Sequence, residues 1–127
     1  MPTPTRQTRQ QTAIREAFLA SDRPLSPQEV LTAASVGAAG IGLATVYRHL
    51  KALVESGWLT PVELPGQPPR YELGGKRHHH HFHCRACGRV FDIPGCPGPL
   101  AASAPKGYEV EDHEITLYGR CPECAGS

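Results

Sequence analysis

Hydrophobic positions in the first part of the chain recur at helical spacing. From Thr8 to Ala20 the apolar residues return every three or four positions, which predicts an amphipathic helix. A second helix is expected from Ser26 to about Ser35, because Ser26-Pro-Gln-Glu29 combines a capping box with a proline at the first helical position. The expected inward residues of these two helices are Ala13, Ile14, Ala17, Phe18, Val30, Leu31 and Ala34.

The helical period returns after a glycine-bearing turn at residues 37–42. A third helix is expected from Leu43 to Ser56, and Gly57 is placed to end it. Strand-like runs follow at residues 58–64 and 70–73, separated by the proline-rich turn 65–69. Three helices followed by a hairpin are typical of a winged helix-turn-helix, which we expect over residues 1–73. The inward stripe of the third helix is Val46, Leu50, Leu53 and Val54.

The rest of the chain has the pattern of short β-strands. After a hinge at residues 74–77, strands are expected at residues 78–84, 90–93, 108–113 and 115–118. The segment 94–107 is too rich in proline and glycine for a long helix. Residues 78–127 therefore form a second, small α/β domain, and the fold class is α+β.

Length and composition narrow the class of protein. Two domains within 127 residues would each have a small core, so metal or oligomerisation should contribute to stability. The longest apolar runs, such as residues 43–46, are far too short for a membrane span, and the basic N-terminus has no apolar stretch behind it. We expect a cytoplasmic protein with no membrane partner and no small organic substrate.

One face of the third helix carries side chains that suit DNA recognition. Thr45, Tyr47 and Arg48 can contact phosphates and base edges, and arginine can hold guanine through two hydrogen bonds. Arg70 beside the wing turn suits a neighbouring phosphate, and Arg6 belongs to an arginine-rich N-terminal segment. The alternative is an ordinary helical subdomain in which Tyr47 packs and Arg48 is solvated.

Four of the five cysteines form two Cys-x-x-Cys pairs, Cys84 with Cys87 and Cys121 with Cys124. Two such turns can aim four thiolates at one point, which makes a closed tetrahedral site that selects zinc and leaves no position for catalysis. A redox pair would need a βαβ context that is missing, and a nucleotide deaminase would need an upstream His-x-Glu. The chain is therefore not expected to be an enzyme.

A run of five histidines interrupted by Phe82 leads into the first cysteine pair. If residues 78–83 form a strand, side chains alternate, so His78 and His80 share one face while His79, His81 and His83 share the other. Two imidazoles at this spacing can reach one ion, so the strand can serve two metal sites back to back. The alternative is a run of solvated histidines.

These residues resemble the ferric uptake regulator family over nearly the whole chain. The motifs that carry the resemblance are Ala44-Thr-Val-Tyr-Arg48, Arg70-Tyr-Glu-Leu73, the segment from His78 to Gly88, and Gly119-Arg-Cys-Pro-Glu-Cys124 with Gly107-Tyr and His113 before it. The resemblance implies a homodimer that binds pseudo-palindromic double-stranded operators when loaded with metal and represses metal-homeostasis or stress genes.

The resemblance also implies three sets of metal ligands. The four paired cysteines match a structural zinc site. The hinge-side sensing site would comprise Glu72, His79, His81 and Asp92. A second site in the dimerisation domain would comprise His78, His80 and His113.

The sequence departs from the family pattern at two places. Where many members supply a sensing-site histidine, this chain has about Pro24, and the segment that often carries a further carboxylate ligand is short and rich in Pro and Gly. Cys96 lies in that segment, so it is either the replacement ligand of the second site or an uninvolved thiol.

The regulatory metal is left open among zinc, iron and manganese. Imidazole with carboxylate accepts all three, whereas a thiolate ligand favours zinc and a zinc-uptake regulator. Because peroxide-sensing members also carry aspartate at the position of Asp92, an iron-based peroxide sensor is one alternative. A zinc-stabilised module that binds protein or RNA without sensing metal is the other.

Overall fold

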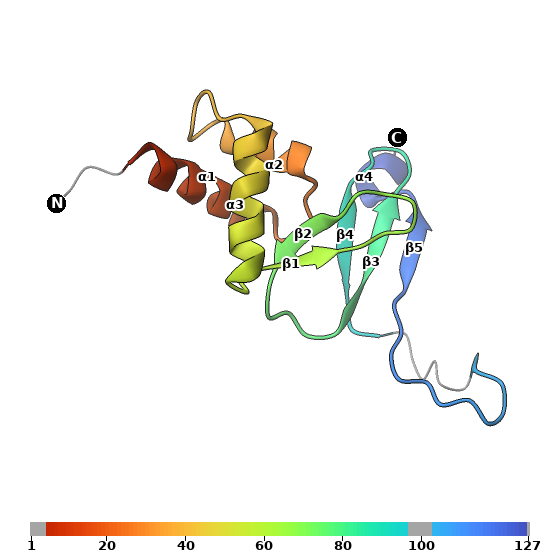
Figure 1. Cartoon of the computed structure of the whole chain (residues 1–127). Helices are drawn as coiled ribbons and strands as arrows, with labels where there is room; N and C mark the ends of the chain where they lie inside the picture. Colours follow the sequence, from red (N-terminus) through yellow and green to blue (C-terminus); the bar gives the residue numbers. More distant parts are fainter. Residues whose placement is uncertain (1–4, 97–102, 127) are drawn as a thin grey trace. The chain divides into compact units, whose positions relative to one another are not determined.

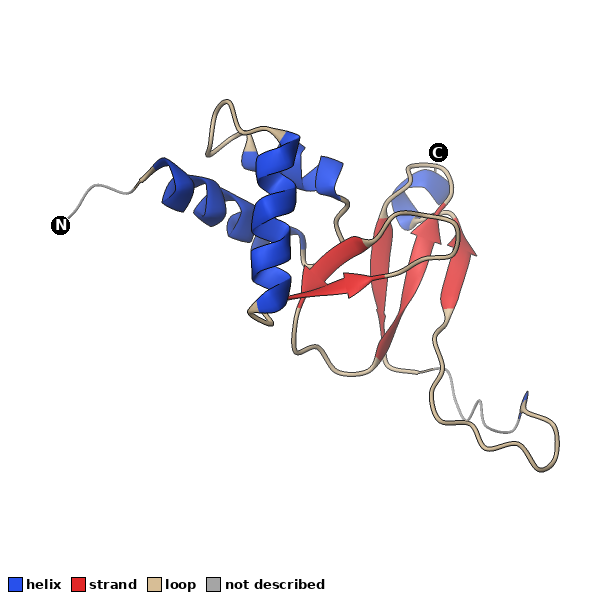
Figure 2. Cartoon of the chain, in the orientation of Figure 1, coloured by secondary structure: helices blue, strands red, loops and turns tan. Residues whose placement is uncertain are grey.

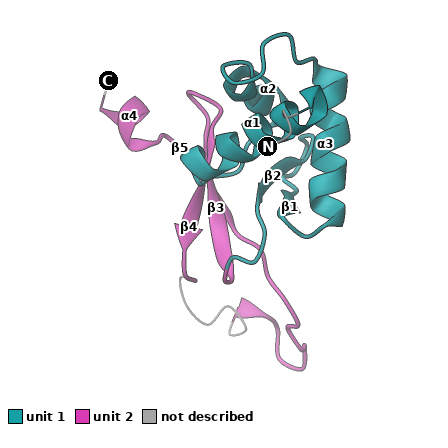
Figure 3. Cartoon of the chain, turned by 90° about the vertical axis from the view of Figure 1, so that its left-hand side faces the viewer, with its two compact units in different colours: residues 1–76 teal, residues 77–127 magenta. Residues whose placement is uncertain are grey.

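The chain divides into two compact units, Met1–Lys76 and Arg77–Ser127 (Figure 3). The structure is a computed structural model, and it describes residues 5–96 and 103–126. Each unit has its own secondary structure, and the fold class is α+β, as the sequence predicts.

The first unit begins with three helices, α1 Arg6–Ser21, α2 Pro27–Ala34 and α3 Leu43–Glu55 (Figures 1 and 2). All three were expected, and no end differs from the predicted one by more than two residues. Ser26 and Glu29 form the predicted capping box of α2: each side chain accepts a hydrogen bond from the backbone N–H of the other residue, at 3.1 and 3.0 Å. Gly57 has a φ of 84°, which explains why a glycine follows the end of α3.

The apolar faces of these helices meet in one core. Ile14, Phe18, Val30, Val46 and Leu50 are at most 1% exposed. Of the predicted inward residues, Leu31 and Val54 are only partly buried and pack against the edge of the core. The core closes with an edge-to-face contact between the rings of Phe18 and Trp58, whose centroids lie 6.3 Å apart.

A two-stranded hairpin completes the first unit. Strand β1 Leu59–Val62 pairs antiparallel with β2 Arg70–Leu73, so that Leu59 lies opposite Leu73 and Val62 opposite Arg70. Tyr71 also exchanges two backbone hydrogen bonds with Leu25, at 2.8 and 2.9 Å. This bridge fixes β2 to the segment before α2, so the wing is tied to the helices that it follows.

The second unit is a three-stranded sheet with a short helix beside it (Figure 1). Its elements are β3 His79–Cys84, β4 Val90–Pro94, β5 Thr116–Gly119 and α4 Pro122–Ala125. The strand order is β4-β3-β5, with β3 antiparallel to β4 and parallel to β5. The histidine-rich strand is therefore central, with a neighbour on each side.

Two details of the second unit differ from the sequence predictions. The strand expected at residues 108–113 is wrong, because no residue described between 103 and 115 lies in a strand, and Tyr108 is 72% exposed. A strand needs a partner, and none of the described strands pairs with this segment. Helix α4 was not foreseen, since its four residues are too few to show a helical period. Within the described part of the chain, no helix has the length and apolarity to cross a membrane.

Candidate metal centres and nucleic-acid interface

The two cysteine pairs come together as the sequence predicts. Cys84 ends β3, and Cys87 lies in the turn to β4. Cys121 is the N-cap of α4, and Cys124 lies within this short helix. All four sulfur atoms lie within 4.8 Å of one another. Cys84 and Cys121 are almost completely buried. Four converging thiols with no other ligand type fit a closed tetrahedral zinc site.

Hydrogen bonds divide the charge unevenly among these sulfurs. The backbone N–H groups of Cys87 and Cys121 both donate to Sγ of Cys84 at 3.4 Å, and they lower the pKa of this thiol to about 6. The Arg89 side chain lowers the pKa of Cys87, whereas hydrogen bonding to Cys121 raises that of Cys124 to about 12. An incoming metal ion therefore meets the most thiolate character at Cys84 and must displace a proton from Cys124.

One face of β3 presents His79 and His81 to Asp92 of the neighbouring strand. Asp92 lies opposite His81 in the β3–β4 register, and its Oδ1 is 3.5 Å from Nε2 of His79 and 3.4 Å from Nε2 of His81. Nδ1–H of His79 donates to the carbonyl of Arg77 at 2.7 Å. A carbonyl can only accept, so Nδ1 of His79 carries a proton, and in the neutral ring Nε2 is then the nitrogen that can bind a metal, as in metal-binding histidines.

His83, the remaining histidine of this face, packs against another side chain, and the fourth predicted ligand, Glu72, belongs to the other unit. His83 packs against the ring of Tyr118, with centroids 5.7 Å apart. Glu72 belongs to the first unit, where it lies on β2 opposite Thr60, and Nζ of Lys76 is 3.8 Å from its carboxylate. Its part in the sensing site stays a prediction.

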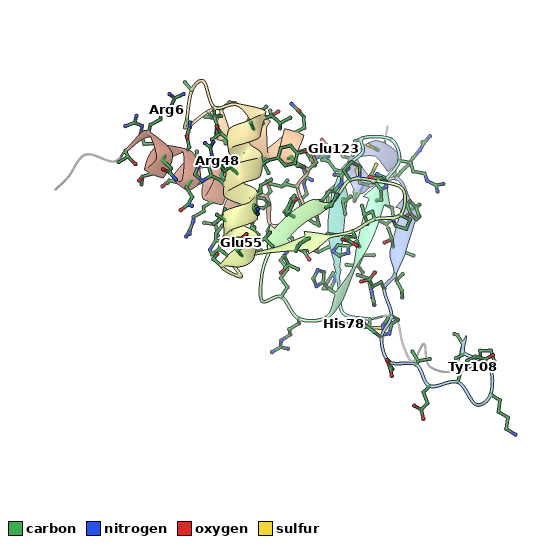
Figure 4. All side chains as sticks on the ribbon, viewed as in Figure 1. Arg6, Arg48, Glu55, His78, Tyr108 and Glu123 are labelled. Carbon is green, nitrogen blue, oxygen red and sulfur yellow. The ribbon has the colours of Figure 1, made fainter. Side chains whose placement is uncertain are left out.

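The other face of β3 brings together His78, His80, His113 and Cys96, whose donor atoms lie within 4.8 Å of one another. Nε2 of His113 is 3.0 Å from Nε2 of His78 and 3.2 Å from Sγ of Cys96. Figure 4 shows His78 at the end of the sheet where β3 begins. The structure thus groups Cys96 with the three histidines, as expected if it replaces a missing ligand.

His80 is the buried member of this second cluster. It is 2% exposed, and its Nε2 has no hydrogen-bond partner among the residues that the structure describes. The backbone N–H of Ile115 donates to its Nδ1 at 3.2 Å and holds the ring in place. Burial lowers the pKa of His80, and the neighbouring His78 and His113 lower it further. A neutral imidazole that accepts a hydrogen bond at Nδ1 carries its proton on Nε2, so a metal that binds at Nε2 must displace that proton.

The predicted DNA-reading face of α3 is accessible. Tyr47 is 49% exposed, Arg48 is exposed, and Nη2 of Arg48 donates to Oγ1 of Thr45 at 3.4 Å. Arg6 is exposed at the first residue of α1 (Figure 4). Tyr47 also lines a hollow of about 210 Å³ formed by α3, the start of α2 and the wing turn.

Arg70, the predicted wing contact, is engaged within the first unit. Its guanidinium donates to Oε1 of Glu29 at 2.9 Å, and its side chain is only 13% exposed. Glu29 also accepts from Arg23 at 2.8 Å. Burial alone would raise the pKa of Glu29, but the Ser26 hydrogen bond and the two arginines outweigh it and lower the pKa. Contact between Arg70 and phosphate stays a prediction, and it would compete with this ion pair.

Comparison with known proteins agrees with the presence of metal-donor clusters and a recognition helix in this chain. The profile of the Ferric uptake regulator family matches residues 3–118. The chain belongs to this family. A ferric uptake regulation protein of Campylobacter jejuni is 36% identical over 87 residues, which is 66% of this chain and 55% of that protein. The chain thus aligns with just over half the length of this relative.

Two further matches cover more of the chain. A ferric uptake regulation protein of Bordetella parapertussis is 34% identical over 115 residues, or 87% of this chain and 83% of that protein. The solved structure of a zinc-bound manganese uptake regulator superposes with a TM-score of 0.75 at 23% identity, covering 94% of this chain and 91% of that one. At this identity the second match speaks for the fold alone.

Sequence reasoning missed some residues around the sites of this family member. Arg89 donates through Nε to Sγ of Cys87, and it also pairs with Glu123 between the last two cysteines. The position of Arg89, two residues after Cys87, is the only signal in the sequence. His49 is a buried residue of α3, and its Nε2 has no hydrogen-bond partner among the described residues.

Proposed function

We propose that this chain is a metal-responsive, DNA-binding transcriptional repressor that acts as a homodimer on pseudo-palindromic duplex operators. The proposal is carried by one observation, that a helix-turn-helix with an accessible recognition helix and three clusters of metal-donor atoms occur in the same chain. Neither part alone would distinguish a regulator from another DNA-binding or metal-binding protein.

The four-cysteine site is proposed to hold structural zinc. Tetrahedral thiolate ligation suits Zn²⁺, and four protein ligands leave no open position for a substrate. The cysteines come from β3, the β3–β4 turn and α4, so an ion would join the sheet to the C-terminal helix. Its contribution is therefore to folding, and the absence of an open position agrees with a family of regulators.

Sensing is assigned to the cluster of His79, His81 and Asp92, with Glu72 as the ligand from the other unit. Imidazole and carboxylate together accept zinc, iron or manganese. Metal can favour one arrangement of the two units only if it binds that arrangement more tightly. A ligand set that draws on both units would provide this difference in affinity, and the DNA-binding arrangement would follow from it.

The second cluster, His78, His80, Cys96 and His113, is proposed as a further regulatory site. Its thiolate favours zinc over manganese. Support for coordination comes from the 3.2 Å separation of Cys96 Sγ and His113 Nε2 and from the gathering of all four donor groups within 4.8 Å of one another. On this basis we propose that the chain is a zinc-uptake regulator, so that its target genes serve zinc uptake.

The homodimer is supported by apolar surface on the second unit. Tyr108, Leu117, Val110 and Tyr118 are 72%, 50%, 42% and 39% exposed, and all lie in this unit. Leu117 and Tyr118 are neighbours on β5, and exposed apolar side chains of this size can be covered by a partner. A second copy of the chain would also present two recognition helices to the two halves of a palindrome.

The proposal is tested by selecting ligands from a random pool of DNA duplexes. Purified full-length protein that retains its four-cysteine zinc is exposed to the pool with added zinc, iron(II) or manganese, and in parallel with a chelator that leaves the structural zinc in place. A two-fold-symmetric motif enriched only with an added divalent metal is expected. Enrichment that is equal with the chelator would favour a module that does not sense metal, and no enrichment would contradict the assignment to DNA.

A further inference from the structure

Arg89 touches both halves of the four-cysteine site. It immediately precedes β4, and its Nε–H donates to Sγ of Cys87 at 3.3 Å. Its Nη2 forms an ion pair with Oε2 of Glu123. Glu123, labelled in Figure 4, lies between Cys121 and Cys124 in the sequence. The guanidinium also lies 5.7 Å from the centroid of the Phe91 ring. Three contacts of different kinds therefore hold this side chain in one place.

The two charged contacts connect segments that are far apart in the sequence. Cys87 belongs to the first cysteine pair, after β3, and Glu123 belongs to the second, in α4. The planar guanidinium has donors pointing in two directions, so it can serve a thiolate and a carboxylate at once. A lysine at this position would offer one point charge and would not reach both partners in the same way.

The negative charge of the zinc-filled site explains why the positive side chain of Arg89 beside Cys87 would stabilise it. Four thiolates carry twice the charge of one Zn²⁺, so the filled site is a net anion. The backbone N–H groups of Cys87 and Cys121 already donate to Cys84. Arg89 adds a full positive charge at the more exposed Cys87, where water or a competing chelator has easier access than at Cys84.

We propose that Arg89 is a positioning residue for the zinc site, which keeps the two cysteine pairs closed around the ion and slows its release. Glu123 holds the guanidinium toward Cys87, so it acts through Arg89. This inference rests on the proposed assignment of zinc to the four cysteines. Ligands and their hydrogen-bonding neighbours act together in metal sites, and loss of such a neighbour weakens metal binding by about 10- to 100-fold.

The chain offers a matched control for the charge. Arg85 lies inside the first cysteine pair, between Cys84 and Cys87, so its replacement changes the net charge of the same turn by the same amount. Its guanidinium lies 4.8 Å from the centroid of the Tyr118 ring. An effect of Arg89→Met that Arg85→Met does not share is therefore due to the contacts of Arg89 and not to charge in general.

The experiment measures zinc release from zinc-loaded, full-length protein. Excess EDTA starts the release, and the zinc that remains on the protein is determined at intervals after rapid gel filtration. We expect Arg89→Met to release zinc about tenfold faster than the unaltered protein, at the lower end of the range for neighbours of metal ligands. Arg85→Met should differ by less than about twofold, since an exposed arginine without a ligand contact contributes little. Glu123→Gln should lie between the two.

A spectroscopic measurement separates an effect on the thiolate from a general loosening of the fold. With cobalt(II) in the four-cysteine site, the thiolate-to-cobalt charge-transfer band reports the electron density on sulfur. Removing a charged donor from Cys87 makes that sulfur a better electron donor, so the band should move to lower energy in Arg89→Met and stay in place in Arg85→Met. Should Arg89→Met not fold, Arg89→Lys replaces it, with faster release and a smaller shift expected.

Equal release rates and identical charge-transfer bands in Arg89→Met and Arg85→Met would overturn this inference. That result would leave the zinc assignment intact, because the unaltered protein would still contain zinc. If instead the unaltered protein holds no zinc at the four cysteines, the proposed function fails at this site. The zinc content of the unaltered protein therefore distinguishes the two failures.

Discussion

At the scale of single residues, the chemical identity of each donor atom, sulfur, nitrogen or oxygen, decides which metal ion the site can hold. Four sulfurs, two imidazoles with a carboxylate, and three imidazoles with one sulfur are three different donor sets within the second unit. Sulfur favours zinc, whereas carboxylate oxygen tolerates manganese and iron. Replacing one donor atom should therefore change the choice of metal without changing the fold.

Cys96 is the residue where this reasoning makes the sharpest prediction. Cobalt(II) added to protein that keeps zinc at the four cysteines should produce a thiolate-to-cobalt charge-transfer band from the second cluster. Cys96→Ser should abolish the band while leaving cobalt bound more weakly by His78, His80 and His113. The physical reason is that no other sulfur belongs to this cluster. A filled second site without such a band in the unaltered protein would make Cys96 an uninvolved thiol.

Arg48 provides the corresponding prediction for DNA. Arg48→Ala should weaken binding to a selected duplex by about 1–3 kcal/mol if the arginine holds a base edge. If it contacts only phosphate, specific and non-specific duplexes should lose affinity alike, and the dependence on salt should flatten. Gel shifts over a range of salt concentrations measure both. Unchanged binding in both Arg48→Ala and Tyr47→Phe would place the recognition surface elsewhere.

At the scale of helices and strands, the sequence predicts the structure best where it depends only on interactions between near neighbours in the chain. The capping box at Ser26, the helical stripes and the alternation along β3 depend on near neighbours, and all are present. The run at residues 108–113 has the alternation of a strand but pairs with no strand among the described residues, and a sequence alone does not reveal which segments pair. For the same reason, the contacts of Arg89 with Glu123 and of Ile115 with His80 join residues too distant for any local pattern.

The ion pairs of Glu29 show how elements are joined, and they predict a dependence on pH. Glu29→Gln keeps a capping partner for Ser26 but loses the charge that faces Arg23 and Arg70. We expect it to lower the free energy of unfolding of the first unit by about 1 kcal/mol at neutral pH. Urea unfolding can be followed by the fluorescence of Trp58, the single tryptophan of the chain.

The sign of the pH effect follows from the lowered pKa of Glu29. Its folded pKa lies below the ordinary value of 4.5, so its stabilising contribution is complete above that value and is lost as the pH falls through the folded pKa. The difference between Glu29→Gln and the unaltered protein should therefore shrink toward zero in acid. A difference that is absent at neutral pH, or that grows in acid, would contradict the role of these ion pairs.

At the scale of the whole molecule, the account depends on linkage between metal and DNA. If metal binds the DNA-competent arrangement more tightly, DNA must in turn raise the affinity for metal by the same factor. The structural zinc and the sensing metal then have separable effects, the first on folding and the second on DNA affinity. The sequence already suggested this division, because the donor sets differ, but the arrangement of the two units that metal selects is not encoded in any local pattern.

The most direct test of this linkage is a fluorescence-anisotropy titration of a selected, labelled duplex with and without added divalent metal. It compares the unaltered protein with His81→Ala, both verified to retain zinc at the four cysteines. The unaltered protein should gain affinity for the duplex by roughly 5- to 150-fold when metal is added. His81→Ala should bind with the weaker, metal-free affinity in both conditions. A full metal-dependent gain in His81→Ala, with the structural zinc in place, would contradict the assignment of sensing to the site of His79, His81 and Asp92.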